Sequence, residues 1–135
     1  MPLVIEPKFA DLLSKAYYIW LTTVREDGMP QPTPVWFVQD GDSFVIYSQP
    51  DAQKVKNVKA HSKVALSFNA DEEAESYVVI MGHATVDPGL PKAIDNPAYL
   101  EKYAKGIPDI GMTPESMSAA FSAAIRVLPT RIRGN

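Results

Sequence analysis

The feature that most constrains the fold of this chain is a succession of short β-prone runs separated by turn signals. The run YYIWLTTV is β-branched and aromatic, and REDGMP after it contains an Asp-Gly turn. TPVWFVQ and FVIYS flank Asp40-Gly41, a pair of residues typical of a tight hairpin. The predicted strands are 17–24, 33–39, 44–48, 63–69, 77–87 and 123–133.

Four other stretches have the apolar spacing or the end signals of helices. Pro7 suits the first turn of one, Asp51 is the expected N-cap of another, and Thr113 followed by Pro114 begins the last. The predicted helices are 7–16, 51–62, 91–106 and 113–122. Because strands follow one another without a βαβ rhythm, we expect a mainly β fold with flanking helices, a small six-stranded antiparallel barrel.

Composition limits the kinds of protein to consider. A chain of 135 residues that is 46% hydrophobic is expected to form one globular domain over residues 1–135. It has no cysteine, and His61 and His83 are far apart, so we expect no metal site. A net charge of −3 without a basic stripe argues against nucleic-acid binding. Since neither a signal peptide nor a membrane span is recognisable, we expect a cytoplasmic protein.

The lysines of this acidic chain are concentrated in PDAQKVKNVKAHSK (50–63). On a helix, Lys56, Lys59 and Lys63 fall on one flank, each three or four residues from the next, and we interpret them as a solvated face. Lys54 lies in the first turn and points away from the other three. Its position therefore needs a separate explanation.

A lysine in the first turn of a helix is locally unfavourable because the helix dipole is positive there. A bound anion reverses this effect, since free backbone N–H groups and the ammonium converge on it. Ser48, which ends the preceding predicted strand, offers a hydroxyl to the same anion. The segment thus suggests a phosphate site, and a surface lysine without a ligand remains the alternative.

Two long segments resemble a known family. GMPQPTPVWFVQDGDSFVIYSQPDAQKVKNVKAHSKVALSF is similar to the first half of the flavin-reductase-like split β-barrel proteins, the pyridoxamine 5'-phosphate oxidase-like superfamily. Within it, G-x-P-x-x-x-PVWF followed by Ser48, Lys54 and Asn57 resembles the actinobacterial branch that binds the deazaflavin coenzyme F420. YLEKYAKGIPDIGMTPESMSAAFSAAIRVLPTRIRG also matches one subgroup of that branch.

This resemblance implies a homodimer with the cofactor in a groove between protomers, a small-molecule substrate, and no membrane or nucleic-acid partner. It places Lys54 at the cofactor phosphate or ring and the segment from Gln31 to Trp36 along the ring. The residues implied in cofactor binding are Gln31, Pro32, Thr33, Pro34, Val35, Trp36, Ser48, Gln53, Lys54 and Asn57. Gln53 stands where family members that bind flavin mononucleotide (FMN) often have Arg, a departure that favours F420, whose phosphate is a diester.

The resemblance leaves three functions open. These are an F420-dependent oxidoreductase, an FMN-dependent oxidoreductase, and a carrier that binds the cofactor without turnover. The sequence contains no recognisable nucleophile, carboxylate pair or serine–histidine–acid set, so no catalytic residue is assigned. Trp36, Tyr47 and Tyr77 are candidates for shaping a pocket, although strand aromatics commonly belong to a core.

Overall fold

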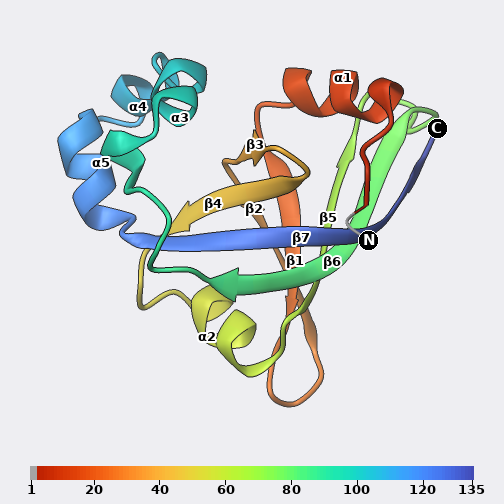
Figure 1. The fold of residues 1–135 in the computed structure, drawn as a ribbon, viewed down its shortest axis with the longest axis horizontal. Helices are drawn as coiled ribbons and strands as arrows, with labels where there is room; N and C mark the ends of the chain where they lie inside the picture. The colour runs from red at the N-terminus through yellow and green to blue at the C-terminus, as the bar shows by residue number, and fades with distance from the viewer. Residues whose placement is uncertain (1–2) are drawn as a thin grey trace.

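A computed structural model describes residues 3–135 and contains a single curled, antiparallel sheet (Figure 1). The sheet has seven strands in the order β2-β1-β5-β6-β7-β4-β3. Their bounds are β1 Ile19–Val24, β2 Pro30–Val35, β3 Val38–Asp40, β4 Ser43–Ser48, β5 Lys63–Asn69, β6 Tyr77–Val86 and β7 Ala123–Gly134.

Short helices flank this sheet on several sides. Their bounds are α1 Pro7–Lys15, α2 Gln53–Ala60, η1 Ala93–Asp95, α3 Pro97–Lys102, α4 Gly106–Asp109 and α5 Pro114–Ala120. The last four form one group between β6 and β7, which we call the cap (residues 93–120) (Figure 1). None of the helices in residues 3–135 is long and apolar enough to cross a membrane.

The sheet must curl because its two edge strands are joined directly. β2 and β3 lie at opposite edges, yet only Trp36 and Phe37 separate Val35 from Val38. Three residue steps span at most about 11 Å, so the two edges approach each other at this end. The result is the predicted mainly β, split-barrel fold with flanking helices.

The strand count differs from the prediction by one. Residues 33–39 were expected to form one strand, but the chain leaves β2 after Val35 and begins β3 at Val38. β2 pairs with β1, whereas β3 pairs with β4 around the predicted hairpin turn, with Asp40 opposite Ser43. A change of partner in mid-run leaves the β-prone composition intact, so it has no local sequence signal.

Pro129 in the last predicted strand indicates an edge position or a bend, and the edge position is wrong. β7 lies inside the sheet, between β6 and β4, and its pairing with β6 is irregular at Met81 and Gly82. A Cβ atom on Gly82 would collide with the backbone of Leu128. Glycine is therefore required opposite the proline, and the irregularity accommodates a residue without a backbone N–H.

Two predicted helices have different bounds in the structure. α2 begins at Gln53 after Ala52, so Asp51 is not its N-cap. The predicted helix 91–106 is divided, because Pro97 starts α3 and the side chain of Asn96 caps it. The capping of the last helix was predicted correctly. Thr113 accepts a hydrogen bond from the Ser116 N–H in a reciprocal capping box.

The buried side chains form two separate clusters. The barrel core is mostly aliphatic and lies inside the curled sheet, where α1 and α2 also insert side chains such as Leu13 and Val55. The cap core lies between the cap and the outer side of β3, β4 and the start of β7. Its members are Val38, Val45, Tyr47, Ala93, Tyr99, Tyr103, Ile107, Met117 and Ala124.

The cap is held at its base by β-type pairing. The Asp87 N–H, just after β6, donates to the Ala124 carbonyl in β7 at 2.8 Å. Arg126 in β7 forms ion pairs with Asp87 at 3.6 Å and with Asp40 at 3.3 Å. The two ends of the segment that carries the cap therefore lie side by side.

Candidate functional site

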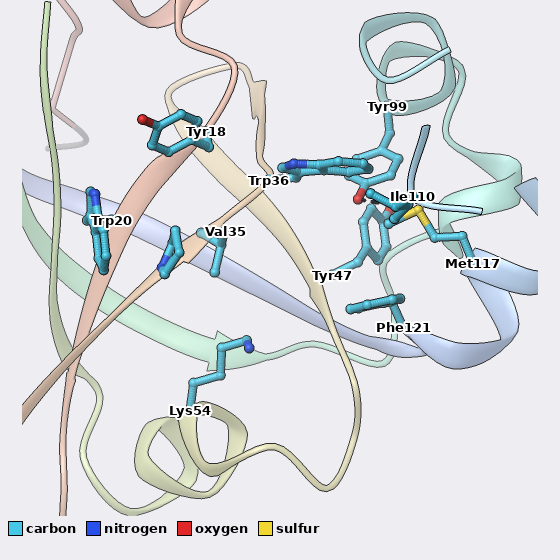
Figure 2. Close-up of a pocket in the computed structure, with 11 residues that line it drawn as sticks. Tyr18, Trp20, Val35, Trp36, Tyr47, Lys54, Tyr99, Ile110, Met117 and Phe121 are labelled. Atoms are coloured by element: carbon cyan, nitrogen blue, oxygen red, sulfur yellow. Dashed lines mark hydrogen bonds between the residues drawn. The ribbon is translucent and has the colours of Figure 1, made fainter. Parts of the chain in front are cut away.

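A pocket of about 520 Å³ lies where the barrel meets the cap (Figure 2). Its lining comes from β1, β2, β4, α2 and the cap, elements that are far apart in the sequence. The lining residues are Tyr18, Trp20, Pro34, Val35, Trp36, Tyr47, Lys54, Tyr99, Ile110, Met117 and Phe121. Figure 2 shows two groups of apolar side chains facing a space into which Lys54 extends.

One side of the pocket, the strand wall, consists of Tyr18, Trp20, Pro34 and Val35. Antiparallel pairing of β1 with β2 places Trp20 directly opposite Pro34. Trp20 is 42% exposed and Tyr18 is 54% exposed, unusual values for such large aromatic side chains. The strand wall is therefore rigid in its backbone and open to solvent at its rim.

The other side, the cap wall, consists of Trp36, Tyr47, Tyr99, Ile110, Met117 and Phe121. The Tyr47 hydroxyl donates to the Pro91 carbonyl at 2.7 Å and accepts from Asn96 Nδ2 at 3.0 Å. The Tyr99 hydroxyl faces the sulfur of Met117 at 3.9 Å. Burial raises the pKa of both tyrosines, so both stay protonated near neutral pH.

Trp36 belongs to the connector (Trp36 and Phe37) that joins the two edges of the sheet. Its ring stacks on Tyr103 with centroids 4.3 Å apart and planes within 4°. The Tyr103 hydroxyl accepts from the Phe37 N–H at 2.8 Å and donates to the Tyr17 carbonyl at 2.7 Å. Gly106 leaves the space for Tyr17 and Trp36, since a Cβ there would contact both.

Lys102 fixes the same connector from α3. Its ammonium donates to the Phe37 carbonyl at 2.9 Å and lies 3.7 Å from the centre of the Phe37 ring. Burial lowers the pKa of Lys102 to about 8. Trp36 is thus held in place by its stack on Tyr103. The backbone of Phe37 is held by hydrogen bonds with the side chains of Tyr103 and Lys102.

Lys54 is the charged residue among those that line the pocket. It is half-buried, and desolvation lowers its pKa below the ordinary lysine value. Within residues 3–135, its ammonium has neither a carboxylate partner nor a hydrogen-bond acceptor. A desolvated cation without a counter-ion at the first turn of α2 is suited to binding an anion.

The structure brings only some of the predicted cofactor residues to the pocket. Pro34, Val35, Trp36 and Lys54 line it. Ser48 is 0% exposed, and its hydroxyl donates to the Gln49 carbonyl at 3.0 Å rather than facing the pocket. The remaining residues of the predicted set are not among its lining: Gln31, Pro32, Thr33, Gln53 and Asn57.

Three of those residues connect α2 to the sheet instead. Asn57 is buried and donates to Thr23 Oγ1 at 2.9 Å and to Gln31 Oε1 at 3.1 Å. Gln53 donates to Asn57 Oδ1 at 2.8 Å. This network fixes α2 against β1 and β2, and so determines where Lys54 enters the pocket.

The other lysines of the segment 50–63, which are Lys56, Lys59 and Lys63, are exposed. Trp36 and Tyr47 line the pocket, whereas Tyr77 lies by a separate hollow along β5 and β6. No group of residues in the described part of the chain could hold a metal ion.

The sequence interpretation missed the contribution of the cap to the pocket. Tyr99, Ile110, Met117 and Phe121 were assigned only to helices or to no element. Their signal was a set of large apolar side chains in the helical segment between the last two strands. That signal does not distinguish a pocket wall from an ordinary core.

A family model for pyridoxamine 5'-phosphate oxidase matches residues 5–134. A solved structure described as an F420 reductase is 26% identical, covers 96% of this chain and 98% of its own, and has a TM-score of 0.74. No curated protein matches this sequence.

Two more distant structures share the fold. A conserved hypothetical protein from Mycobacterium tuberculosis has a TM-score of 0.78 at 18% identity, covering 98% of this chain and 85% of its own. The heme storage protein HutZ from Vibrio cholerae has a TM-score of 0.67 at 16% identity, covering 98% and 95%.

Proposed function

Because this chain belongs to the pyridoxamine 5'-phosphate oxidase family, we propose that it is an F420-dependent oxidoreductase acting on small unsaturated or carbonyl-containing molecules. The observation that carries the proposal is Lys54, a half-buried cation that faces the pocket without a counter-ion in residues 3–135. The 26% identity to a protein described as an F420 reductase supports the same cofactor.

The residues of the pocket are suited to a flat ring that carries an anionic group. Trp20, Pro34 and Val35 form an apolar wall for the ring, and Lys54 supplies a counter-charge for a phosphate. At the start of α2, the N–H groups of Gln53 and Lys54 have no backbone acceptor within residues 3–135, whereas the Val55 N–H donates to the Ala52 carbonyl. Ser48 is not part of this arrangement because its hydroxyl is already bonded to Gln49.

The charge of the site favours F420 over FMN. FMN ends in a phosphate monoester that carries about two negative charges near neutral pH, whereas the phosphate of F420 is a diester with one. Lys54 is a single cation, and the side chain of its neighbour Gln53 is engaged with Asn57. One counter-charge matches one anionic charge.

The bound cofactor would supply the redox chemistry by giving or taking a hydride. The protein's own part is to hold the ring and a substrate together and to exclude water. The tyrosines of the cap wall stay neutral and are bonded to the protein, so they act as contact surfaces. Redox chemistry supplied by the cofactor agrees with the sequence analysis, which assigned no catalytic residue.

We propose that the functional unit is a homodimer. Trp20 and Met81 are exposed on the outer face of the sheet, at 42% and 37%, and pairing with β5 places them in adjacent rows. Trp20 also forms the rim of the pocket. A second copy of the chain packed on this face would bury these side chains and close the open side of the pocket.

The direct test of the site is the affinity of Lys54→Ala for F420, measured by fluorescence titration. Removing the ammonium should weaken binding by about 1.5–3 kcal/mol, which corresponds to about 10- to 150-fold, because a charge-assisted bond is lost. Lys56→Ala is the matched control, since Lys56 is exposed on the same helix. Equal effects of the two substitutions would contradict the assignment of Lys54.

Two further measurements separate the alternative functions. Titration with FMN tests the other cofactor, because flavin and deazaflavin absorb at different wavelengths. Steady-state assays with reduced F420 and a panel of enones test turnover. Tight binding without turnover would identify a carrier, and failure to bind either cofactor at micromolar concentration would contradict both enzyme functions.

A further inference from the structure

The two walls of the pocket differ in what they can offer to a bound molecule. The strand wall lies next to Lys54 and the first turn of α2, where a charged group is stabilised. The cap wall has no charged side chain among its lining residues. Figure 2 shows its members gathered on one side of the space, with Lys54 entering from α2 below.

The two tyrosine hydroxyls of the cap wall are already engaged, whereas the Trp36 indole N–H has no acceptor within residues 3–135. The Tyr47 hydroxyl has two partners, the Pro91 carbonyl and the Asn96 amide, and the Tyr99 hydroxyl faces Met117. No buried side-chain nitrogen or oxygen in residues 3–135 lacks a hydrogen-bond partner. A ligand at this wall therefore meets ring surfaces, a thioether, aliphatic carbon and the Trp36 indole N–H.

The aromatic rings of this wall are held in fixed orientations. Tyr47 and Tyr99 pack edge to face, with ring centroids 4.9 Å apart and planes at 82°. Trp36 is fixed by its stack on Tyr103 at 4.3 Å. Rigid aromatic surfaces gain most from flat apolar partners, since little side-chain entropy is lost on contact.

The rim of the cap wall remains apolar at its exposed edge. Ile110 follows α4 and is 53% exposed, although it lines the pocket. Phe121, which ends α5, is only partly buried. A molecule seated on the cap wall would cover both side chains and remove their apolar surface from water.

We infer that the cap wall is the substrate half of the pocket and that it selects flat, uncharged molecules with an aryl group over small or polar ones. The inference rests on the proposed function, in which the cofactor occupies the strand wall and Lys54. A charged or strongly polar substituent would lose its hydration against the cap wall and would find only the Trp36 N–H as a free side-chain donor among its described residues. An aryl group would instead bury its own apolar surface together with that of the cap wall.

Equilibrium dialysis with two neutral enones tests this selectivity. Benzylideneacetone carries a phenyl ring and 2-cyclohexen-1-one does not, so the first should bind about 10-fold more tightly or better. The measurement is made with and without F420, and so does not depend on turnover. Equal affinities for the two enones in both conditions would overturn the inference.

A matched pair of substitutions tests whether the cap wall is responsible for the preference for aryl enones. Ile110 and Leu128 are both 53% exposed, but Leu128 lies on β7 and outside the pocket lining. Ile110→Glu should weaken benzylideneacetone binding by about 10-fold, because it places a charge at the apolar rim. Leu128→Glu should leave it unchanged, and both variants should bind F420 as the native chain does.

The possible results distinguish this inference from the proposed function. Loss of enone affinity in Ile110→Glu with intact F420 binding supports both. An unchanged enone affinity in a folded Ile110→Glu variant overturns the inference about the substrate half of the pocket and leaves the cofactor proposal standing. If the native chain binds no F420 but still prefers benzylideneacetone, with the same Ile110 dependence, the cofactor proposal fails and the apolar subsite stands.

Discussion

The barrel core and the cap core are built from different side chains and solve different packing problems. The barrel core is dominated by aliphatic residues such as Ile19, Leu21 and Leu66 that project inward from long antiparallel strands. The cap core contains Tyr47, Tyr99 and Tyr103. The first needs only close packing, whereas the second must also satisfy three hydroxyl groups.

This difference follows from the lengths of the elements. Strands of the barrel reach ten and twelve residues and are stabilised by neighbours on both sides. The cap helices have three to seven residues, too few to be stable alone. Hydrogen bonds from tyrosine hydroxyls to backbone groups therefore replace the support that longer helices would give. The pocket lies at the boundary, with one wall from each region.

The largest effect should come from cavities made in the two cores. Leu66→Ala and Ile107→Ala each remove a fully buried aliphatic side chain, one from the barrel and one from the cap. Each should lower the free energy of unfolding of its own region by about 2–5 kcal/mol. Hydrogen exchange should show lost protection throughout the chain for Leu66→Ala, but only in the cap for Ile107→Ala. Equal loss of protection in β5 and β6 would show that the two cores unfold as one unit.

The next effect concerns the tyrosine hydroxyl that fixes the connector. Tyr103→Phe keeps the stack on Trp36 but leaves the Phe37 N–H without its partner. Urea unfolding should show a loss of about 1–3 kcal/mol, because a buried donor becomes unsatisfied. Tyr47→Phe provides the comparison within the same core, since it loses bonds to Pro91 and Asn96. A neutral result at Tyr103 would mean that the stack alone positions Trp36.

A smaller effect should appear as a pH dependence that is specific to the cap. Burial lowers the pKa of Lys102 to about 8, below the ordinary lysine value that it regains on unfolding. Above about pH 8 the unfolded chain binds more protons than the folded one, so stability rises with pH up to about 10.5. Lys102→Met should lack this rise when the free energies of unfolding at about pH 7 and about pH 9.5 are compared. A parallel pH dependence in both proteins would contradict a desolvated Lys102.

The smallest effect should come from the ion pair at the base of the cap. Asp87→Asn removes the charge that faces Arg126 at 3.6 Å, while Asp40 remains near the same guanidinium. The expected loss in the free energy of unfolding is about 0–1 kcal/mol and should shrink as salt is added. A large, salt-independent loss would show that the junction depends on this pair rather than on packing.

The barrel could be predicted from the sequence because its signals are local. The Asp40-Gly41 turn and the β-prone runs each depend on a few residues, and the structure contains both. The division of residues 33–39 between two edges could not be predicted, since it depends on which strands close the barrel. Which strands pair with each other is determined by the tertiary fold and not by the local sequence.

Of the residues that line the pocket, Lys54 and the segment Pro34, Val35 and Trp36 had been predicted from the sequence. Lys54 has a local signature, an unfavourable cation at a helix start, and the structure places it in the pocket. The role of Asn57 in fixing α2 depends on Thr23 and Gln31, residues far away in the sequence. The contribution of the cap segment to the cap wall was missed because Met117 and Phe121 follow the same apolar pattern as core residues.

The hydrogen bond between the Asp87 N–H and the Ala124 carbonyl means that the whole cap leaves and rejoins the sheet at one point. A chain segment whose two ends lie side by side can be lengthened, shortened or exchanged while the strand pairing at its base stays the same. Transplanting residues 88–122 between relatives would therefore transfer Tyr99, Ile110, Met117 and Phe121 of the cap wall and leave the Lys54 side as it was. In this architecture, the choice of substrate could diverge independently of the choice of cofactor.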